Sequence, residues 1–336
     1  MWILGISALF GNLVVLVLRL REKTKTHVQI VQAFFIGNLA FSDFLMGSYM
    51  LILGSADLYF ADEYFIHSDE WRAGRLCKFA GFICLLSSEA SVFFLTAISV
   101  DRLLGAGFPL SSVKFSPTSA KLVGGIIWLI TFTVSIIPIL TAGPDSDWYD
   151  LSDVCIGLPL ITRPSSFVFQ ASGVSDQVVF DLPVAEDTKP AWYFSIILFL
   201  GINLLCFLVI FICYLVIFIQ NRKSGKMVQR TGRQDEEVKL ALRMFVIVGT
   251  DFVCWMPVII MGVLSQTGAV IIPLEAYIWS VVFLLPINSS LNPYLYTLVS
   301  WVSSKKRQMT MGSLETLKSD IHDTTTRGKC TLRKPL

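Results

Sequence analysis

The sequence predicts an all-α membrane protein: a bundle of seven transmembrane helices, with the N-terminus outside the cell and the C-terminus inside. Of the 336 residues, 54% are hydrophobic and only 15% are charged, whereas a soluble domain carries about 25% charged residues. The apolar residues come in blocks long enough to cross a bilayer core of about 30 Å. Basic residues gather in alternate loops between these blocks. A protein with a large soluble core needs neither of these two patterns, so together they favour a membrane protein.

Seven predicted spans follow one another along the first 300 residues. Their ranges are 2–20, 28–54, 73–104, 120–142, 191–219, 236–265 and 272–300. A secretory signal is the alternative for the first block. That block has no basic leading segment and no small-residue cleavage site, and its apolar run is too long, so a retained span is favoured. The third span is predicted to be the central helix of the bundle.

The loop charges orient the bundle, because Lys and Arg favour the cytoplasmic side. Basic residues follow the first, fifth and seventh spans, namely Arg19, Arg21, Lys23, Lys25, Arg222, Lys223, Lys226, Arg230, Arg233, Lys305, Lys306 and Arg307. Acidic residues gather after the second span and between the fourth and fifth, namely Asp57, Asp62, Glu63, Asp69, Glu70, Asp145, Asp147, Asp150, Asp153, Asp181, Glu186 and Asp187. An odd number of spans requires the same orientation.

Residues 141–190 are predicted to form a long second extracellular loop. Within it, residues 167–169 and 178–182 have the alternation of a β-hairpin, which would form a lid. Cys155 in this loop and Cys77 at the outer end of the third span both face the oxidising side, where a disulfide persists. Such a bond would pin the loop across the mouth of the bundle.

The C-terminal segment divides into two predicted parts. Residues 301–308 are expected to form an amphipathic helix lying on the membrane. Residues 309–336, rich in Ser, Thr, Lys and Arg, are expected to be a disordered cytoplasmic tail. Cys330 in the tail is interpreted as a free thiol, with lipidation as the alternative.

Carboxylates within the spans are candidate functional groups, because they are costly in hydrocarbon and usually face the bundle interior. Asp43 is either a hydrogen-bonded structural carboxylate or a sodium or proton site. The amides that would share it are Asn12, Asn288 and Asn292. Asp251 precedes Pro257 by about one and a half turns, where a proline permits a kink. A carboxylate at such a bend, facing Asn288 or Asn292, is well placed to hold one conformation and release it.

Two further charged groups leave alternatives open. Glu89 in the third span is expected either to bind a ligand or to cap a buried polar network. Arg102 at the cytoplasmic end of that span has candidate partners in Asp101 and in Glu237, at the start of the sixth span. The alternative for Arg102 is a side chain that simply reaches the interface.

Across the hydrophobic part of the chain, one motif per span carries a resemblance. The motifs are Asn12, LAFSD ending at Asp43, Cys77, Asp101 with Arg102, Trp128, Tyr214, CWMP at 254–257 and NPYLY at 292–296. In this order and together they resemble the fingerprints of rhodopsin-like (class A) G protein-coupled receptors.

Departures from the class narrow the resemblance to a branch. Asp251 stands where the class usually has Phe, and the fifth span has no proline between Ala191 and Tyr214. The third span carries SSEASVFFLT and the seventh reads LLPINSSLNPYLYTL. This combination resembles the leucine-rich-repeat-containing receptors, and most of all the relaxin-receptor branch. Those relatives carry an extracellular repeat domain, whereas this chain begins at the first span, as a fragment or as a receptor that works without that domain.

The resemblance implies a role for each candidate residue. Arg102 would be the switch that is held by Asp101 and Glu237 at rest and freed toward a G protein. Tyr214 and Tyr296 would swing inward in the active state, and Asp43 would be the sodium-linked acid. The core latch and hinge would comprise Asp251, Trp255, Pro257, Asn288, Asn292 and Pro293.

The function implied is a plasma-membrane receptor that passes an extracellular peptide or protein hormone signal to a heterotrimeric G protein. Expected contacts also include membrane lipid beneath the basic loop at 221–233, and neither nucleic acid nor a cofactor beyond a structural sodium ion is expected. An ion-coupled transporter or channel that uses the intramembrane carboxylates is the alternative. An opsin would need a lysine between residues 272 and 300, which is absent. An enzyme is not expected, because the three histidines lie outside the spans.

Overall fold

The computed structural model describes residues 1–21, 26–108, 111–141, 154–156, 167–169, 178–180, 194, 196–224, 245–257, 259–261, 264, 279–284 and 286–295. Within these residues, five helices are long and apolar enough to cross a membrane, namely Trp2–Arg21, His27–Phe60, Arg75–Gly107, Pro117–Thr141 and Gly201–Gln220. Residues 245–257, 259–261 and 286–295 are also helical, within the predicted sixth and seventh spans. The fold is therefore helical with several membrane-length segments.

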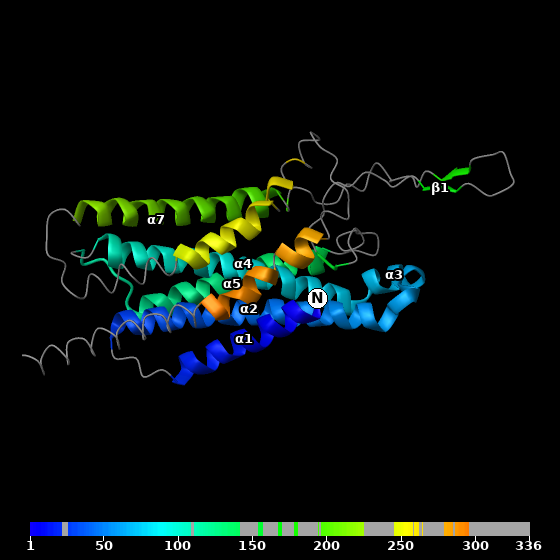
Figure 1. Cartoon of the computed structure of the whole chain (residues 1–336), viewed down its shortest axis with the longest axis horizontal. Coiled ribbons are helices and arrows are strands. Elements are labelled where there is room, and N and C mark those ends of the chain that lie inside the picture. The colour runs from blue at the N-terminus through cyan, green and yellow to red at the C-terminus, as the bar shows by residue number, and fades with distance from the viewer. Residues whose placement is uncertain are drawn as a thin grey trace, which may run out of the picture. The chain divides into compact units, whose positions relative to one another are not determined.

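Helix α4 (Arg75–Arg102) lies at the centre of the other long helices. It contacts α2 (His27–Phe60), α5 (Pro117–Thr141) and α7 (Leu204–Ser224), and these helices run side by side with α4 in Figure 1. Most of α4 is buried, whereas α1 (Trp2–Arg21) packs on α2 and buries only four residues. A helix surrounded on several sides must be filled with small or apolar residues, as the third predicted span is.

Helix α2 continues to Phe60, past its predicted end at residue 54. Its start is set by a capping box, in which the Thr26 side chain accepts from the Gln29 backbone and the Gln29 side chain accepts from the Thr26 backbone. The segment that follows, predicted as an acidic loop, forms the 3₁₀ turn η1 (Ala61–Glu63) and helix α3 (Tyr64–Ala73). The rings of Tyr64, His67 and Trp71 pack around Phe60, so aromatic contacts hold α3 against the end of α2.

Three of the helical segments include a π-helical turn. The turn η2 (Leu103–Gly107) continues α4, η3 (Ile197–Asn203) precedes α7, and η4 (Ser280–Leu284) lies within the predicted seventh span. A π turn inserts an extra residue and so rotates the helix that follows. The fifth span thus changes its helical register at η3, in a stretch that has no proline.

A two-stranded antiparallel sheet joins β1 (Phe167–Phe169) to β2 (Val178–Phe180), as the alternating pattern predicts. Phe167 pairs with Phe180, and Phe169 pairs with Val178. Several predictions fall outside the described residues, namely those for Glu237, Tyr296, Cys330, residues 301–308 and residues 309–336.

Candidate functional site

A group of buried polar side chains joins α1, α2 and the helical residues 286–295. Asp43, fully buried on α2, accepts a 2.8 Å hydrogen bond at Oδ2 from the amide of Asn292. The hydroxyls of Ser91 and Ser289 lie beside the same carboxyl group. Asn12 on α1 donates instead to the backbone oxygens of Ala8 and Ser289, at 2.8 and 2.9 Å. Asp43 and Asn12 therefore hold the same segment by two separate contacts.

Within the described residues, several oxygens of this group have no hydrogen-bond partner, namely Asp43 Oδ1, Asn292 Oδ1, Asn12 Oδ1 and Ser91 Oγ. Buried polar atoms without partners are costly, because they lose water and gain nothing in return. Each of these atoms can accept a hydrogen bond or coordinate a cation. The cluster has the chemistry of a small site for a cation or a water molecule.

Asp251 supplies a second buried carboxylate next to this cluster. It lies in the helical residues 245–257, is fully buried, and accepts a hydrogen bond from the amide of Asn288. Asp251 is close enough to Asp43 for the two carboxyl groups to interact electrostatically. About one turn later, the ring of Trp255 is buried against Phe207 of α7, with 6.4 Å between ring centroids. The Asp251–Asn288 bond is thus a direct polar link between the two helical segments at the C-terminal end of the bundle.

Glu89 belongs to a buried polar contact between α4 and the fifth span. The amide of Asn203 donates a 3.0 Å hydrogen bond to Glu89 Oε1, and both residues are at most 1% exposed. Asn203 is the last residue of the π-helical turn η3. The contact places Glu89 in a buried polar pair, which leaves its role as a ligand-binding group or a structural cap a prediction. No sequence pattern singled out Asn203, because the π turn changes which residues face α4.

Arg102 is buried at the end of α4, with only 1% of its surface exposed. Its guanidinium donates to the carboxylate of its neighbour Asp101. The amide of Gln32, assigned with its oxygen toward Arg102, accepts from both terminal guanidinium nitrogens at 2.7 and 2.6 Å. Tyr214 of α7 lies nearby, close to Ser99 and Arg102. The Arg102 guanidinium therefore has hydrogen-bond partners on both α4 and α2.

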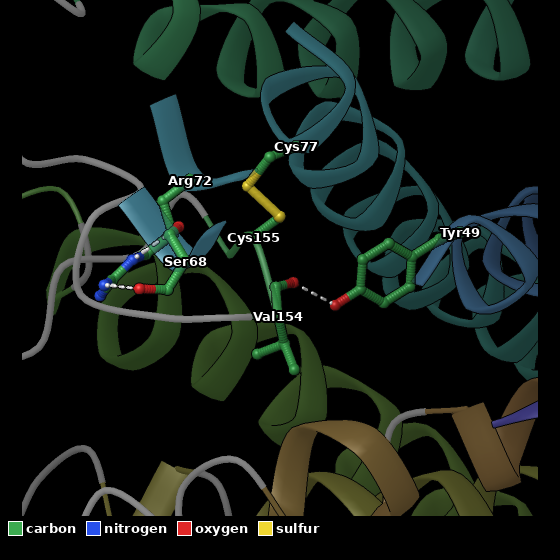
Figure 2. The surroundings of a disulfide bond; sticks show 6 residues. All are labelled: Tyr49, Ser68, Arg72, Cys77, Val154 and Cys155. Carbon is green, nitrogen blue, oxygen red and sulfur yellow. Dashed lines mark hydrogen bonds between the residues drawn. A yellow bond between two sulfur atoms is a disulfide. The ribbon is translucent and has the colours of Figure 1, made fainter. Parts of the chain in front are cut away.

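At the opposite end of α4, the disulfide Cys77–Cys155 is present (Figure 2), as the cysteine placement predicts. The hydroxyl of Tyr49 on α2 donates a 2.7 Å hydrogen bond to the carbonyl oxygen of Val154. Val154, Cys155 and Ile156 are all buried. Residues 154–156 are therefore anchored to two helices, to α4 by the disulfide bond and to α2 by a hydrogen bond.

Comparison with known families decides the class of this bundle. The model of the family described as 7 transmembrane receptor (rhodopsin family) matches residues 11–296. The chain belongs to the rhodopsin family of seven-transmembrane receptors. Among curated relatives, G-protein coupled receptor GRL101 of Lymnaea stagnalis is 36% identical over 297 residues, which cover 88% of this chain and 24% of that protein.

Two hormone receptors are also similar to this rhodopsin-family chain. Relaxin receptor 1 of Mus musculus is 32% identical over 304 residues, covering 89% of this chain and 36% of that protein. Thyrotropin receptor of Felis catus is 30% identical over 301 residues, covering 88% of this chain and 34% of that protein. The chain therefore spans between 24% and 36% of the length of these relatives.

Two further contacts of this rhodopsin-family bundle involve residues that sequence reasoning did not single out. Gln32 was not singled out, because a glutamine near the start of an apolar helix is ordinary and only the packing of α2 on α4 brings it to Arg102. Tyr49 was not singled out because its partner is a backbone oxygen, which no side-chain pattern marks. Both lie on α2, and sequence patterns do not predict how α2 is rotated against α4 along their long contact.

Proposed function

We propose that this chain is the transmembrane signalling part of a plasma-membrane hormone receptor that activates a heterotrimeric G protein. The bundle would cross the membrane seven times, with the N-terminus outside and Arg102 at the cytoplasmic end. Its similarity to relaxin and thyrotropin receptors supports a peptide or protein hormone as the signal. Basic residues in the last turn of α1, on the side of Arg102, support this orientation.

The observation that carries the proposal is the buried, hydrogen-bonded guanidinium of Arg102. A buried charge persists only when it is paired and hydrogen-bonded, and Asp101 with Gln32 supplies these partners. The described arrangement would be the resting state, in which Arg102 is withheld. Separating α2, α4 and α7 at this end would release the guanidinium toward a G protein.

Activation would then be a shift between two packings rather than a chemical reaction. A hormone that binds the open packing more tightly moves the equilibrium by its difference in affinity for the two states. The pairs Asp43–Asn292 and Asp251–Asn288 hold the closed packing through the core. Because the pairs join different helical segments, movement of residues 245–257 must break at least one of them.

The test is guanine-nucleotide exchange without hormone, measured in membranes that contain the chain and a panel of purified G proteins. We expect exchange above that of membranes without the chain, and we expect Arg102→Ala to lower it to that background. Arg75→Ala is the matched control, because Arg75 is an exposed arginine at the other end of the same helix.

Wild-type exchange in the Arg102→Ala variant, at equal amounts of protein in the membrane, would refute the proposed switch. The same preparation separates a receptor from an ion-coupled transporter. Carboxylate-dependent sodium or proton flux into sealed vesicles, without nucleotide exchange on any G protein, would favour the transporter.

We also propose that Asp43 holds a sodium ion in the resting state. The unpartnered oxygens of Asp43, Ser91 and Asn292 lie around one buried carboxylate, and buried charges are paired or coordinate metals. A bound ion would supply the positive charge that the described residues around Asp43 lack. It would thereby favour the closed packing.

Sodium is therefore expected to raise the thermal unfolding midpoint of the purified chain, relative to choline chloride at equal ionic strength. A ligand that binds only the folded state stabilises it by mass action. Each kcal/mol of added stability raises the unfolding midpoint by about 2 °C or more. Asp43→Asn should remove this difference, whereas Asp57→Asn, an exposed carboxylate on the same helix, should keep it. Equal sodium dependence in both variants would exclude the site.

A further inference from the structure

An open groove lies between α1 and α2, near the end of the bundle that carries Arg102. Its volume is about 380 Å³, and its walls include Leu16, Arg19 and Leu20 of α1 with Phe34, Gly37 and Asn38 of α2. Leu20 is 86% exposed, so the groove opens on the outer surface of the bundle rather than toward its core. Both helices are long and apolar enough to cross a membrane, so this surface faces lipid.

The interior of the groove is largely apolar, because the one amide side chain that lines it, Asn38, is already hydrogen-bonded within the protein. The Asn38 amide donates a 2.8 Å hydrogen bond to the backbone oxygen of Phe34, and its Oδ1 accepts a 2.8 Å bond from the indole of Trp128. A ligand therefore meets hydrocarbon side chains here rather than an unused polar group. This lining suits an acyl chain.

Gly37 makes the room for that chain. A Cβ placed on Gly37 would meet no atom within 4 Å, so the missing side chain leaves open space rather than a tight helix contact. The ring of Phe34 reaches toward α5, where it would lie 2.7 Å from a Cβ placed on Gly124. The groove is thus bounded by side chains that other helices hold in position.

Arg19 supplies the charge at the end of the groove. It lies in the last turn of α1, at the side of the bundle where α2 begins and where Gln32 reaches Arg102. A guanidinium has five N–H donors in a planar fork that fits a phosphate, so it can bind a phosphate while making another contact. A sterol hydroxyl, which carries no charge, could accept one hydrogen bond from this group but would gain less from it than a phosphate does.

We propose that the groove between α1 and α2 binds one anionic phospholipid, with an acyl chain over Gly37 and the headgroup phosphate on Arg19. Anionic lipids are concentrated in the cytoplasmic leaflet, the side on which basic residues of membrane proteins gather. The proposal takes its membrane orientation from the proposed function, but its test requires neither hormone nor G protein.

The test is native mass spectrometry of the purified full chain in detergent, after addition of phosphatidylserine, phosphatidylcholine or cholesterol at equal amounts. We expect the first bound phosphatidylserine to be retained about fivefold better than phosphatidylcholine, the factor expected for one arginine near a membrane surface. Arg19→Gln should remove this preference. Arg21→Gln, a change of the other arginine in the same turn, should keep it.

A second pair of variants tests the groove without changing charge. Gly37→Leu should fill it and abolish retention of the first lipid of either headgroup. Gly125→Leu on α5, where a Cβ likewise meets no atom within 4 Å, should leave retention unchanged. Equal retention of the two phospholipids by the wild type, equal effects within either pair of variants, or displacement of phosphatidylserine by cholesterol would each overturn the proposal.

Discussion

Replacing Asp251 by Ala is expected to raise hormone-independent signalling about tenfold. Leaving a buried hydrogen-bonding group without its partner costs about 1–3 kcal/mol, and a loss of about 1.4 kcal/mol changes a two-state ratio tenfold. The bond between Asp251 and Asn288 joins the helical residues 245–257 to residues 286–295 in the arrangement that withholds Arg102. Its loss therefore disfavours the arrangement that we propose as the resting state.

The measurement is guanine-nucleotide exchange or cAMP accumulation, normalised to the protein present at the cell surface. Asn288→Ala removes the same bond from the other side, so it should raise basal signalling by a similar factor. The double variant should resemble either single one, because two residues that act through one contact are not additive. Thr250→Ala is the control, since among the described residues its hydroxyl bonds to the oxygen of Ile247 within its own helix.

Basal signalling at the wild-type level in both Asp251→Ala and Asn288→Ala would contradict this latch. So would independent, additive increases in the double variant. Asp251→Asn refines the interpretation, because an amide oxygen still accepts from Asn288 while the carboxylate beside Asp43 is removed. Because the loss of repulsion between the two carboxyl groups favours the closed packing, Asp251→Asn should leave basal signalling at or below the wild-type level, in contrast to Asp251→Ala.

The features that are easiest to predict from the sequence depend on a single residue type in a single compartment. A cysteine at the outer end of the central span and one in the long outer loop can only meet on the oxidising side, and Cys77 and Cys155 do so. The centrality of α4 likewise follows from a composition that suits burial on all sides. The family is detectable for a similar reason, since its motifs are short and fall one in each successive span.

Features that depend on helix rotation were not predictable. Asn203 faces Glu89 only after the π-helical turn η3, and no residue in that stretch marks the turn. Gln32 meets Arg102 because α2 is turned that way against α4. Helix α3 is too polar to predict as a membrane segment, and it is held by rings that pack on Phe60. In each case, contacts between helices decide what the local sequence leaves open.

Removing the disulfide is expected to have the largest effect on stability. Cys77 and Cys155 are 78 residues apart, and closing a loop of that length stabilises the folded state by about 4.5 kcal/mol in the chain-entropy model. That value is an upper limit here, because helices already inserted in a membrane restrict the unfolded chain. Cys77→Ala and Cys155→Ala should each lower the thermal unfolding midpoint and delivery to the cell surface.

The double variant Cys77→Ala/Cys155→Ala should be no worse than either single one, because the bond is lost once. Cys84→Ala is the matched control: it removes a buried free cysteine from the same helix without cutting a cross-link.

Tyr49→Phe leaves the disulfide but removes the hydrogen bond to Val154, and should cost about 1 kcal/mol. If the disulfide and the Tyr49 hydrogen bond together hold residues 154–156, Tyr49→Phe should cause a smaller loss of stability once the disulfide is gone. An unanchored segment no longer presents the Val154 oxygen to Tyr49. Equal losses from Tyr49→Phe with and without the disulfide would mean that the two contacts act independently.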